Sequence, residues 1–411
     1  MRRVTTGRDA LLIYAAAFLR STTVGLVGVI VAIYLGELGL SLGSIGVVIG
    51  AGMCGGAVAT MLVSVGGDVV GRRRLLMMLA GLSALGYGAL SISASLFILM
   101  PLAFCGTLNA MGRDRGAASA LEQAILPETT TPERRTWALA WYNLILDGGH
   151  AVGALAGATP ALLASWLHVD PVGAHRLTLW MCAAAVASSA GLYAALSSAV
   201  EVPSPPGLRE TPTRLESDSR RAVAKLAVLF GLDSIGGGFL SSALIAYWFF
   251  QRYGLSEREL AVLFFTARVL NAASHLGAAW LARRIGLVNT MVLTHLPSSL
   301  FLMAAPAAAS PGLAAGLFLA RESLVEMDVP TRQSYVMAIV RPSERTFASG
   351  VTNLTRNVGW ALGPSLAGLV MQHVVLAGPL LVGGALKVAY DLMLYRSFRH
   401  LKAPEEQGDG V

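Results

Sequence analysis

The stretch Arg321-Glu-Ser-Leu-Val-Glu-Met-Asp-Val-Pro-Thr-Arg332 lies inside an apolar run that extends from about Gly312 to about Val340. It places two arginines and three acids in a segment otherwise suited to cross a membrane. Charged side chains at membrane depth face a bundle interior or a water-filled cavity, where they pair with one another or bind a ligand. The stretch therefore predicts a helical bundle that encloses a polar path.

The composition of the 411-residue chain agrees with this prediction. Hydrophobic residues make up 55% of the chain and charged residues 13%, whereas a soluble protein has about 25% charged residues. The three cysteines show neither the spacing of a metal site nor that of a disulfide framework. We see no nucleophile–base set, phosphate loop or nucleic-acid motif, so we expect no enzyme, no cofactor and no nucleic-acid partner. The expected partners are a small-molecule substrate and the lipid bilayer, with the protein a monomer.

A helix needs about 20 apolar residues to cross a bilayer, and the chain offers twelve such stretches. We number these predicted spans 1 to 12: 9–36, 42–64, 74–95, 97–125, 134–162, 174–199, 222–250, 258–282, 287–308, 312–340, 345–373 and 378–397. They predict an all-α integral membrane protein. Its parts are a six-helix bundle at 1–200, a cytoplasmic linker at 201–221 rich in proline and charge, a second six-helix bundle at 222–400 and a cytoplasmic tail at 401–411.

Basic residues are distributed unevenly between the two ends of the predicted spans. Twenty of the 31 Lys and Arg residues lie on the side that holds both termini and the linker, and three lie on the other side. Cytoplasmic loops carry an excess of basic residues. We therefore expect a protein of the plasma (bacterial inner) membrane with both termini in the cytoplasm, and the net charge of +7 reflects this orientation.

The two halves of the chain resemble each other at a spacing of 210–215 residues. The matched positions include Arg20 with Asp233, Glu122 with Arg332, Tyr34 with Tyr247, Asn143 with Asn353, Gly149 with Gly359, and Gly153 with Gly363. Internal repeats of this kind build many transporter folds, in which substrate binds near the membrane midplane between the repeats.

The stretch between spans 2 and 3 reads Ser64-Val-Gly-Gly-Asp-Val-Val-Gly-Arg-Arg-Arg74. It resembles the loop signature of the major facilitator superfamily, Gly-x-Leu-Ala-Asp-Arg-x-Gly-Arg-Lys, and departs from it at Ser64, Gly66 and Val69. The matching residues are Asp68, Gly71, Arg72 and Arg73. The resemblance covers the whole chain without identifying a subfamily. It implies two pseudo-symmetric six-helix bundles, and it gives these four residues a part in switching between inward-facing and outward-facing states.

A second signature of that family lies in an unexpected place. Its antiporters often carry Gly-x8-Gly-x3-Gly-Pro-x2-Gly-Gly in span 5, but here the match is in span 11, at Gly350, Gly359, Gly363, Pro364, Ala367 and Gly368. Glycines at every fourth position line one helix face and allow close packing. Helix packing and a link to antiport both remain open as interpretations.

Eight basic and eight acidic residues lie within the predicted spans. This balance indicates mutual pairing and does not favour a strongly anionic substrate. The resemblance implies that spans 1, 4, 7 and 10 line the central cavity. The candidate residues for the substrate cavity and for coupling are Arg20, Arg113, Asp114, Glu122, Asp233, Arg321, Glu322, Glu326, Asp328 and Arg332.

Opposite charges at matched positions lead us to expect that Arg20 pairs with Asp233, and Glu122 with Arg332, as the two bundles move. Pairs at helical spacing are expected to be structural, namely Asp328 with Arg332 and Lys387 with Asp391.

Two pairs of residues are candidates for carrying a proton. Glu322 and Glu326 are four residues apart on one helix face, and burial together with mutual repulsion disfavours ionisation of both. We expect one of them to hold a proton near neutral pH. Asp147 and His150 form a candidate proton relay.

These observations predict a secondary active transporter that works by alternating access. Without an ATPase motif the energy must come from an ion gradient, with the proton as first choice and sodium as the alternative. Export of a small organic molecule by proton antiport is our first choice. Uptake of a metabolite by proton symport and a permease-like sensor without a transport cycle are the alternatives.

The predicted orientation can be tested by labelling. We expect a cysteine placed at Ser217, in a background without native cysteines, to be protected from an impermeant thiol reagent in intact cells, because the linker is predicted to be cytoplasmic. Labelling of this cysteine from outside would show that the predicted orientation is wrong.

Overall fold

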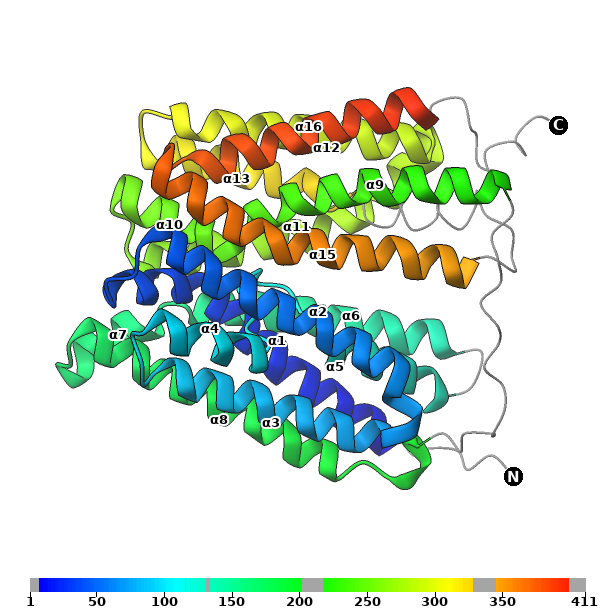
Figure 1. The fold of residues 1–411 in the computed structure, drawn as a ribbon, viewed down its shortest axis with the longest axis horizontal. Helices are drawn as coiled ribbons and strands as arrows, with labels where there is room; N and C mark the ends of the chain where they lie inside the picture. The colour runs from blue at the N-terminus through cyan, green and yellow to red at the C-terminus, as the bar shows by residue number, and fades with distance from the viewer. Residues whose placement is uncertain (1–6, 115, 131–133, 202–216, 328–344, 399–411) are drawn as a thin grey trace. The chain divides into compact units, whose positions relative to one another are not determined.

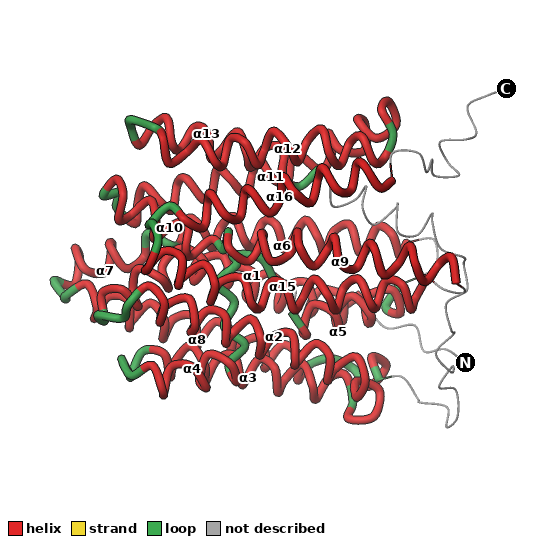
Figure 2. Tube along the Cα trace, turned by 45° about the horizontal axis from the view of Figure 1, so that its top comes forward, coloured by secondary structure: helices red, strands yellow, loops and turns green. Residues whose placement is uncertain are grey.

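The computed structural model describes residues 7–114, 116–130, 134–201, 217–327 and 345–398, and the structural statements below concern these residues. They form helices joined by short loops, without a strand among them (Figure 2). They group into two compact units, Met1–Gly207 with Ser241–Phe265, and Leu208–Leu240 with Thr266–Val411. The predicted all-α class is confirmed, while the predicted bundle and linker boundaries stay a prediction.

The first unit is built around helix α1, which packs against α6, α8 and α10, while α3 packs against α8 and α2 against α4 (Figure 1). Its helices are α1 (Gly7–Glu37), α2 (Leu42–Val70), α3 (Arg72–Leu90), α4 (Leu96–Cys105), α5 (Ala117–Ile125), α6 (Arg135–Ala156), α7 (Thr159–Leu167), α8 (Pro171–Ala194) and α10 (Ser242–Tyr253).

In the second unit, α9 packs against α15 and α16, and α12 packs against α13 and α16. Its helices are α9 (Ser217–Phe239), α12 (Leu287–Ala304), α13 (Pro311–Val325), α15 (Arg345–His373) and α16 (Gly378–Phe398). Helix α11 (Glu257–Ile285) begins in the first unit and continues into the second.

Six stretches among the described helices are long and apolar enough to cross a membrane, judged by length and composition. They coincide with the predicted spans 1, 2, 5, 6, 7 and 9, and the stretch Gly7–Glu37 has a mean hydropathy of 1.9. These stretches agree with the predicted class of integral membrane protein.

Predicted span 4 is not one continuous helix, which corrects the prediction for 97–125. Helix α4 ends at Cys105 and α5 begins at Ala117. Between them the backbone takes positive φ at Thr107 (50°) and Gly112 (68°). The side chain of Asn109 accepts from the Met111 N–H (3.0 Å) and donates to the Arg113 carbonyl (2.7 Å). An asparagine that bonds nearby backbone competes with helix formation, so the segment unwinds.

Spans 5, 7 and 10 also differ from their predicted extents. Span 5 is divided between α6 and α7, with Pro160 in the first turn of α7, where proline is tolerated. Span 7 is divided between α9 and α10, directly after three consecutive glycines at 236–238 that weaken the helix. In span 10, α13 ends at Val325, and residues 328–344 lie outside the described part of the chain.

Glycines at matched positions bring helices together in each unit. A Cβ atom added to Gly153 of α6 would lie 2.0 Å from the Thr22 carbonyl oxygen of α1. A Cβ atom added to Gly363 of α15 would lie 2.4 Å from the Gly238 Cα of α9. Both distances are too short for a side chain. These contacts support the packing interpretation of the glycine motif in span 11, and they show the same close helix pair in both halves of the repeat.

The close contact of α6 with α1 predicts a specific loss of stability. Gly153→Ala should lower the free energy of unfolding by about 1–3 kcal/mol, because the added methyl group overpacks the contact. Gly148→Ala is the matched control on the same helix, since its Cβ would meet nothing within 4 Å. It should be neutral or stabilising. Thermal unfolding in detergent measures both variants, and equal melting temperatures would contradict the packing interpretation.

Candidate functional site

Three charged side chains of the first unit contact one another: Arg20 of α1 lies between Asp114 and Glu122. Arg20 Nη2 lies 2.6 Å from Glu122 Oε2 and Nη1 lies 3.0 Å from Oε1, while Nε contacts Asp114 Oδ2. The side chains of Arg20, Asp114 and Glu122 are 11%, 6% and 0% exposed. One guanidinium is therefore shared between two buried carboxylates.

The two carboxylates are not equivalent. Besides the two Arg20 nitrogens, Glu122 accepts from the hydroxyls of Tyr142 (2.8 Å) and Tyr193 (2.7 Å). Four donors suit an ionised carboxylate, which only accepts. Asp114 receives the Arg20 Nε and a longer bond from the Gly116 N–H (3.3 Å). Asp114 is thus the less well satisfied carboxylate and the one better placed to exchange a partner.

The candidate relay residues Asp147 and His150 lie beside this cluster, on α6. His150 Nε2 accepts from the backbone N–H of Asp114 (2.7 Å), and its Nδ1 lies 4.0 Å from Asp147 Oδ1. A ring nitrogen that accepts carries no proton, so His150 is neutral with the proton on Nδ1. The side chain of Asp147 is 44% exposed. The geometry connects a partly exposed carboxylate to the backbone of Asp114, and the relay itself stays a prediction.

The unwound segment between α4 and α5, which carries Arg113 and Asp114, has partners for its backbone on α10. The Ala243 N–H donates to the Ala110 carbonyl (3.2 Å), and the Ser242 hydroxyl donates to the Met111 carbonyl (2.9 Å). Non-helical backbone at membrane depth is tolerated where it is buried in protein or lines a cavity. Interrupted helices of this kind form the substrate sites of many transporters.

The predicted pairing of Arg20 with Asp233 relates residues of two different units and stays a prediction, and the structure describes the contacts of each residue within its own unit. Arg20 is held by the two carboxylates of its own unit, and the Lys387 ammonium donates to Asp233 Oδ1 (2.7 Å). Glu122 is likewise engaged by Arg20, and its predicted mate Arg332 lies outside the described residues. Repeat symmetry identifies equivalent positions, whereas the described partners of Arg20, Glu122 and Asp233 come from neighbouring segments of their own units.

The predicted direct pair of Lys387 with Asp391 needs correction, because a histidine side chain lies between the two groups. Both oxygens of Asp391 lie near His295 Nδ1, at 2.9 and 3.0 Å, and His295 Nε2 lies 3.3 Å from Lys387 Nζ. The imidazole of α12 therefore stands between the two charged groups of α16. The sequence analysis did not single out His295, because a lone histidine in an apolar helix has no spacing signal.

In span 10, Glu322 pairs with its neighbour Arg321 and accepts from the Asn271 side-chain amide (2.9 Å). Glu326 lies at the C-terminal cap of α13 and is buried. The proposed sharing of a proton between Glu322 and Glu326 stays a prediction. The remaining two candidates of this span, Asp328 and Arg332, lie outside the described residues.

The predicted switch loop forms the turn between α2 and α3, with Gly71 at a φ of 100°. The carboxylate of Glu201 accepts from the backbone N–H of Arg72 (2.7 Å) and of Arg73 (3.1 Å). A carboxylate at a helix N-terminus satisfies free N–H groups and complements the helix dipole. The first residue of the predicted linker thus caps α3, a contact that sequence analysis missed. The side chain of Asp68 lies outside the described residues.

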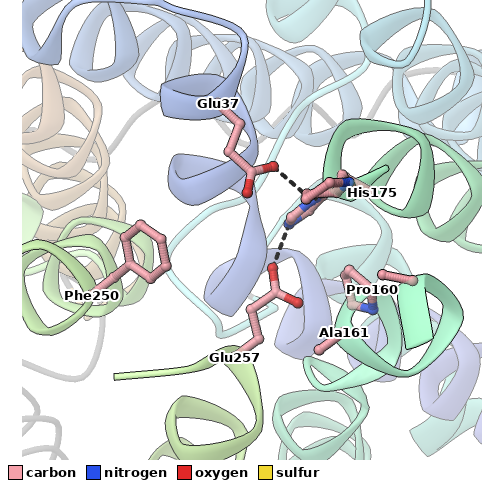
Figure 3. Close-up of a pocket in the computed structure, with 8 residues that line it drawn as sticks. Glu37, Pro160, Ala161, His175, Phe250 and Glu257 are labelled. Carbon is pink, nitrogen blue, oxygen red and sulfur yellow. Dashed lines mark hydrogen bonds and ion pairs between the residues drawn. The ribbon is translucent and has the colours of Figure 1, made fainter. Parts of the chain in front are cut away.

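A second titratable cluster in the first unit borders a pocket of about 130 Å³ (Figure 3). His175 Nδ1 lies 3.0 Å from Glu37 Oε2 and Nε2 lies 2.7 Å from Glu257 Oε1. The ring also stacks on Tyr34, with centroids 5.6 Å apart. Acceptor oxygens at both ring nitrogens require a proton on each nitrogen or on a carboxyl group. This protonated bridge ties the ends of α1, α8 and α11 together, and no sequence pattern pointed to it.

The ion pairs of the first unit predict a pattern of coupling. Arg20→Met leaves two buried carboxylates without their cation, and breaking such a pair costs roughly 3–5 kcal/mol. In a double-mutant cycle on unfolding, Arg20→Met and Glu122→Gln should be non-additive by about 0.5–3 kcal/mol. Arg20→Met and Asp233→Asn should be additive, because each has its own partners. Coupling of Arg20 to Asp233 without coupling to Glu122 would contradict the observed pairing.

Comparison with known proteins shows which family the chain belongs to. The family model described as Major Facilitator Superfamily matches residues 13–364. A membrane protein of Saccharomyces cerevisiae described as uncharacterized is 24% identical over 417 residues, covering 94% of this chain and 93% of that protein.

Solved structures share the fold at low identity. They include the nucleoside transporter NupG (TM-score 0.72, 12% identity, 95% of this chain and 99% of that one). A bacterial homologue of the human lysosomal transporter Spinster, inward-facing and unoccupied, has a TM-score of 0.69 (15% identity, 95% and 94% covered). A D-xylose-proton symporter has a TM-score of 0.71 (13% identity, 98% and 99% covered). With the family match across most of its length, the chain belongs to the Major Facilitator Superfamily and is a membrane-embedded secondary transporter, not an enzyme.

Proposed function

We propose that the protein exports a small organic molecule in exchange for protons, by alternating access. The observation that carries this proposal is the sharing of one guanidinium, that of Arg20, between Asp114 and Glu122. Among the described contacts of this cluster, two ionised carboxylates share one cation, which leaves an excess of negative charge on the three groups. Burial of such a charge is costly, so the site favours one further positive charge or proton.

Asp114 is the group on which that charge would be compensated. Among the described residues, Glu122 has four donors, whereas Asp114 receives Arg20 and one backbone N–H. A proton on Asp114 and a cationic or hydrogen-bond-donating substrate group beside it satisfy the same need and therefore compete. Competition between proton and substrate for one group produces antiport. If substrate instead binds best when Asp114 is protonated, the same residues give symport, which is the alternative.

Other features of the proposal rest on the sequence. The excess of basic residues on one side supports a location in the plasma (bacterial inner) membrane with cytoplasmic termini. Sodium is the alternative coupling ion, and a sensor without a transport cycle is the alternative of another class. The structural relatives named for nucleosides and D-xylose suggest the chemistry of the first probes to test, without identifying the substrate of this chain.

The proposal is tested by flux in proteoliposomes with an imposed pH gradient and no membrane potential. The probes are radiolabelled nucleosides, sugars, short peptides and organic cations. An acidic lumen should drive accumulation of the transported probe, because protons leaving the vesicle exchange for it. Asp114→Asn should abolish accumulation while retaining exchange of labelled for unlabelled probe. Glu259→Gln, at an exposed position of α11, is the control and should behave as wild type.

The alternatives give different results in the same assay. Accumulation driven by an acidic exterior would establish symport. Accumulation driven by a sodium gradient alone would establish sodium, instead of the proton, as the coupling ion. A wild-type protein that binds probes, shown by thermal shift, and moves none of them under any gradient would support the sensor and overturn the proposal.

A further inference from the structure

A cluster of buried titratable groups lies wholly within the second unit, on α9, α12 and α16, where α16 packs against both of the other helices (Figure 1). His295 of α12 contacts Asp391 and Lys387 of α16, and Lys387 in turn bonds Asp233 of α9. The side chains of His295, Asp391, Lys387 and Asp233 are 2%, 0%, 8% and 7% exposed. The family resemblance does not place α12 or α16 among the cavity-lining helices.

The contacts of His295 define where its protons are. An ammonium group has three donors and no acceptor, so Nε2, 3.3 Å from Lys387 Nζ, acts there as an acceptor. Nδ1 then holds the proton and donates toward the two oxygens of Asp391, at 2.9 and 3.0 Å. In this arrangement the imidazole is neutral and Asp391 is ionised.

This arrangement leaves a charge to be compensated. Among the described residues, the imidazole of His295 is the polar partner of Asp391, whose side chain is 0% exposed. The four groups then comprise two carboxylates and one ammonium, which bonds Asp233, and a buried charge without a counter-charge is strongly disfavoured and tends to become neutral. The His295–Asp391 pair becomes neutral as a whole on taking up one proton, either on Asp391 or on Nε2.

Further ring and charged groups lie on these helices and on α13 and α15, which pack against α12 and α9. The Tyr390 ring stands edge-on to His295, with centroids 6.0 Å apart. On α15, the Arg356 guanidinium lies 4.6 Å above the Trp360 ring. On α13, Arg321 pairs with Glu322.

The cluster is also protected from water on one side. Apolar side chains of the same three helices pack together, on the side where α9 and α12 begin and α16 ends. They are Leu226, Leu229, Phe230, Val288, Met291, Val292, Tyr390 and Leu394. A proton bound at His295 or Asp391 is therefore held in a place that bulk water does not reach from that side.

We propose that His295 and Asp391 form a binding site for one exchangeable proton, and that its occupancy controls the ion pair of Lys387 with Asp233. A proton from solvent adds to Nε2 or to Asp391 and returns to solvent, with no other bond made or broken. On Nε2 it would face the Lys387 ammonium as a second donor, and the two repel. Asp233 Oδ1, 3.9 Å from Nε2, is the acceptor for which imidazolium and ammonium then compete.

The position of Asp233 gives this competition a mechanical consequence. Asp233 lies near the end of α9, which stops at Phe239, and the chain then enters α10 in the first unit. A proton-dependent change in the contact of Lys387 on α16 with Asp233 on α9 would therefore occur close to the break between α9 and α10 in span 7. This consequence for transport rests on the proposed function, whereas proton binding by the pair does not.

The test is made without substrate, by pH-difference infrared spectroscopy of the purified protein in detergent. Wild type should show a pH-dependent signal of a buried carboxyl and imidazole. Asp391→Asn, which keeps the shape of a protonated carboxyl group, should lose it, and so should His295→Gln. Lys387→Met should retain the signal and move it to more alkaline pH, because the repelling ammonium is gone. His373→Gln removes an exposed histidine of the same unit and should retain the buried signal unchanged.

Melting curves identify any variant that fails to fold, and Asp391→Asn carries the test if His295→Gln does not fold. An unchanged buried signal in folded Asp391→Asn would overturn the proton site, and an unmoved signal in folded Lys387→Met would overturn its link to the ion pair. Because no gradient or probe is used, failure here is distinguishable from failure of proton-coupled export in the flux assay.

Discussion

Charge buried in a bundle of apolar helices must find a partner, and this requirement determines which helices of the protein are neighbours. In the first unit, the Glu122 carboxylate of α5 receives Arg20 of α1, Tyr142 of α6 and Tyr193 of α8. One fully buried carboxylate thus fixes the relative positions of four helices. In the second unit His295 does the same for α12 and α16. Loss of a central group would leave several others buried and unpaired.

The same requirement applies to the backbone. The segment between α4 and α5 is unwound, and its polar groups are satisfied by Asn109, by His150 and by the start of α10. Close approach of helices through Gly153 and Gly363 brings backbone against backbone. The interrupted helix is stable because neighbouring elements replace the hydrogen bonds that a continuous helix would have made internally.

Long apolar runs, the bias of basic residues and the matched glycines were sufficient to predict the helical membrane fold from sequence, because each depends on a property of single residues along the chain. The break in span 4 was missed because Gly106 and Asn109 in an apolar run are equally compatible with a packed helix. The pairing of Arg20 with Asp233 stays a prediction, because repeat symmetry relates positions, while the described contacts of each residue lie within its own unit. The bridge formed by His175 and the cluster around His295 depend on tertiary neighbours that no local pattern encodes.

Each of the two units contains a cluster of buried charged groups, and the two clusters use similar groups from different residues. Each contains one strong cation, two carboxylates and a histidine. Arg20 contacts both Asp114 and Glu122, with His150 bonded to the Asp114 backbone, whereas Lys387 contacts Asp233 and His295, and His295 contacts Asp391. The clusters differ in chemistry. Arginine stays charged under all conditions in a protein and fits carboxylates through several nitrogens. Asp114 beside it is suited to meet a ligand, because its partner cannot lose its charge. In the second unit the histidine bonds a carboxylate directly, and a proton can move between them within a fully buried pair. The proposed exchange of substrate for a proton at Asp114 would therefore belong to the first unit, and the His295–Asp391 pair would store a further proton in the second unit.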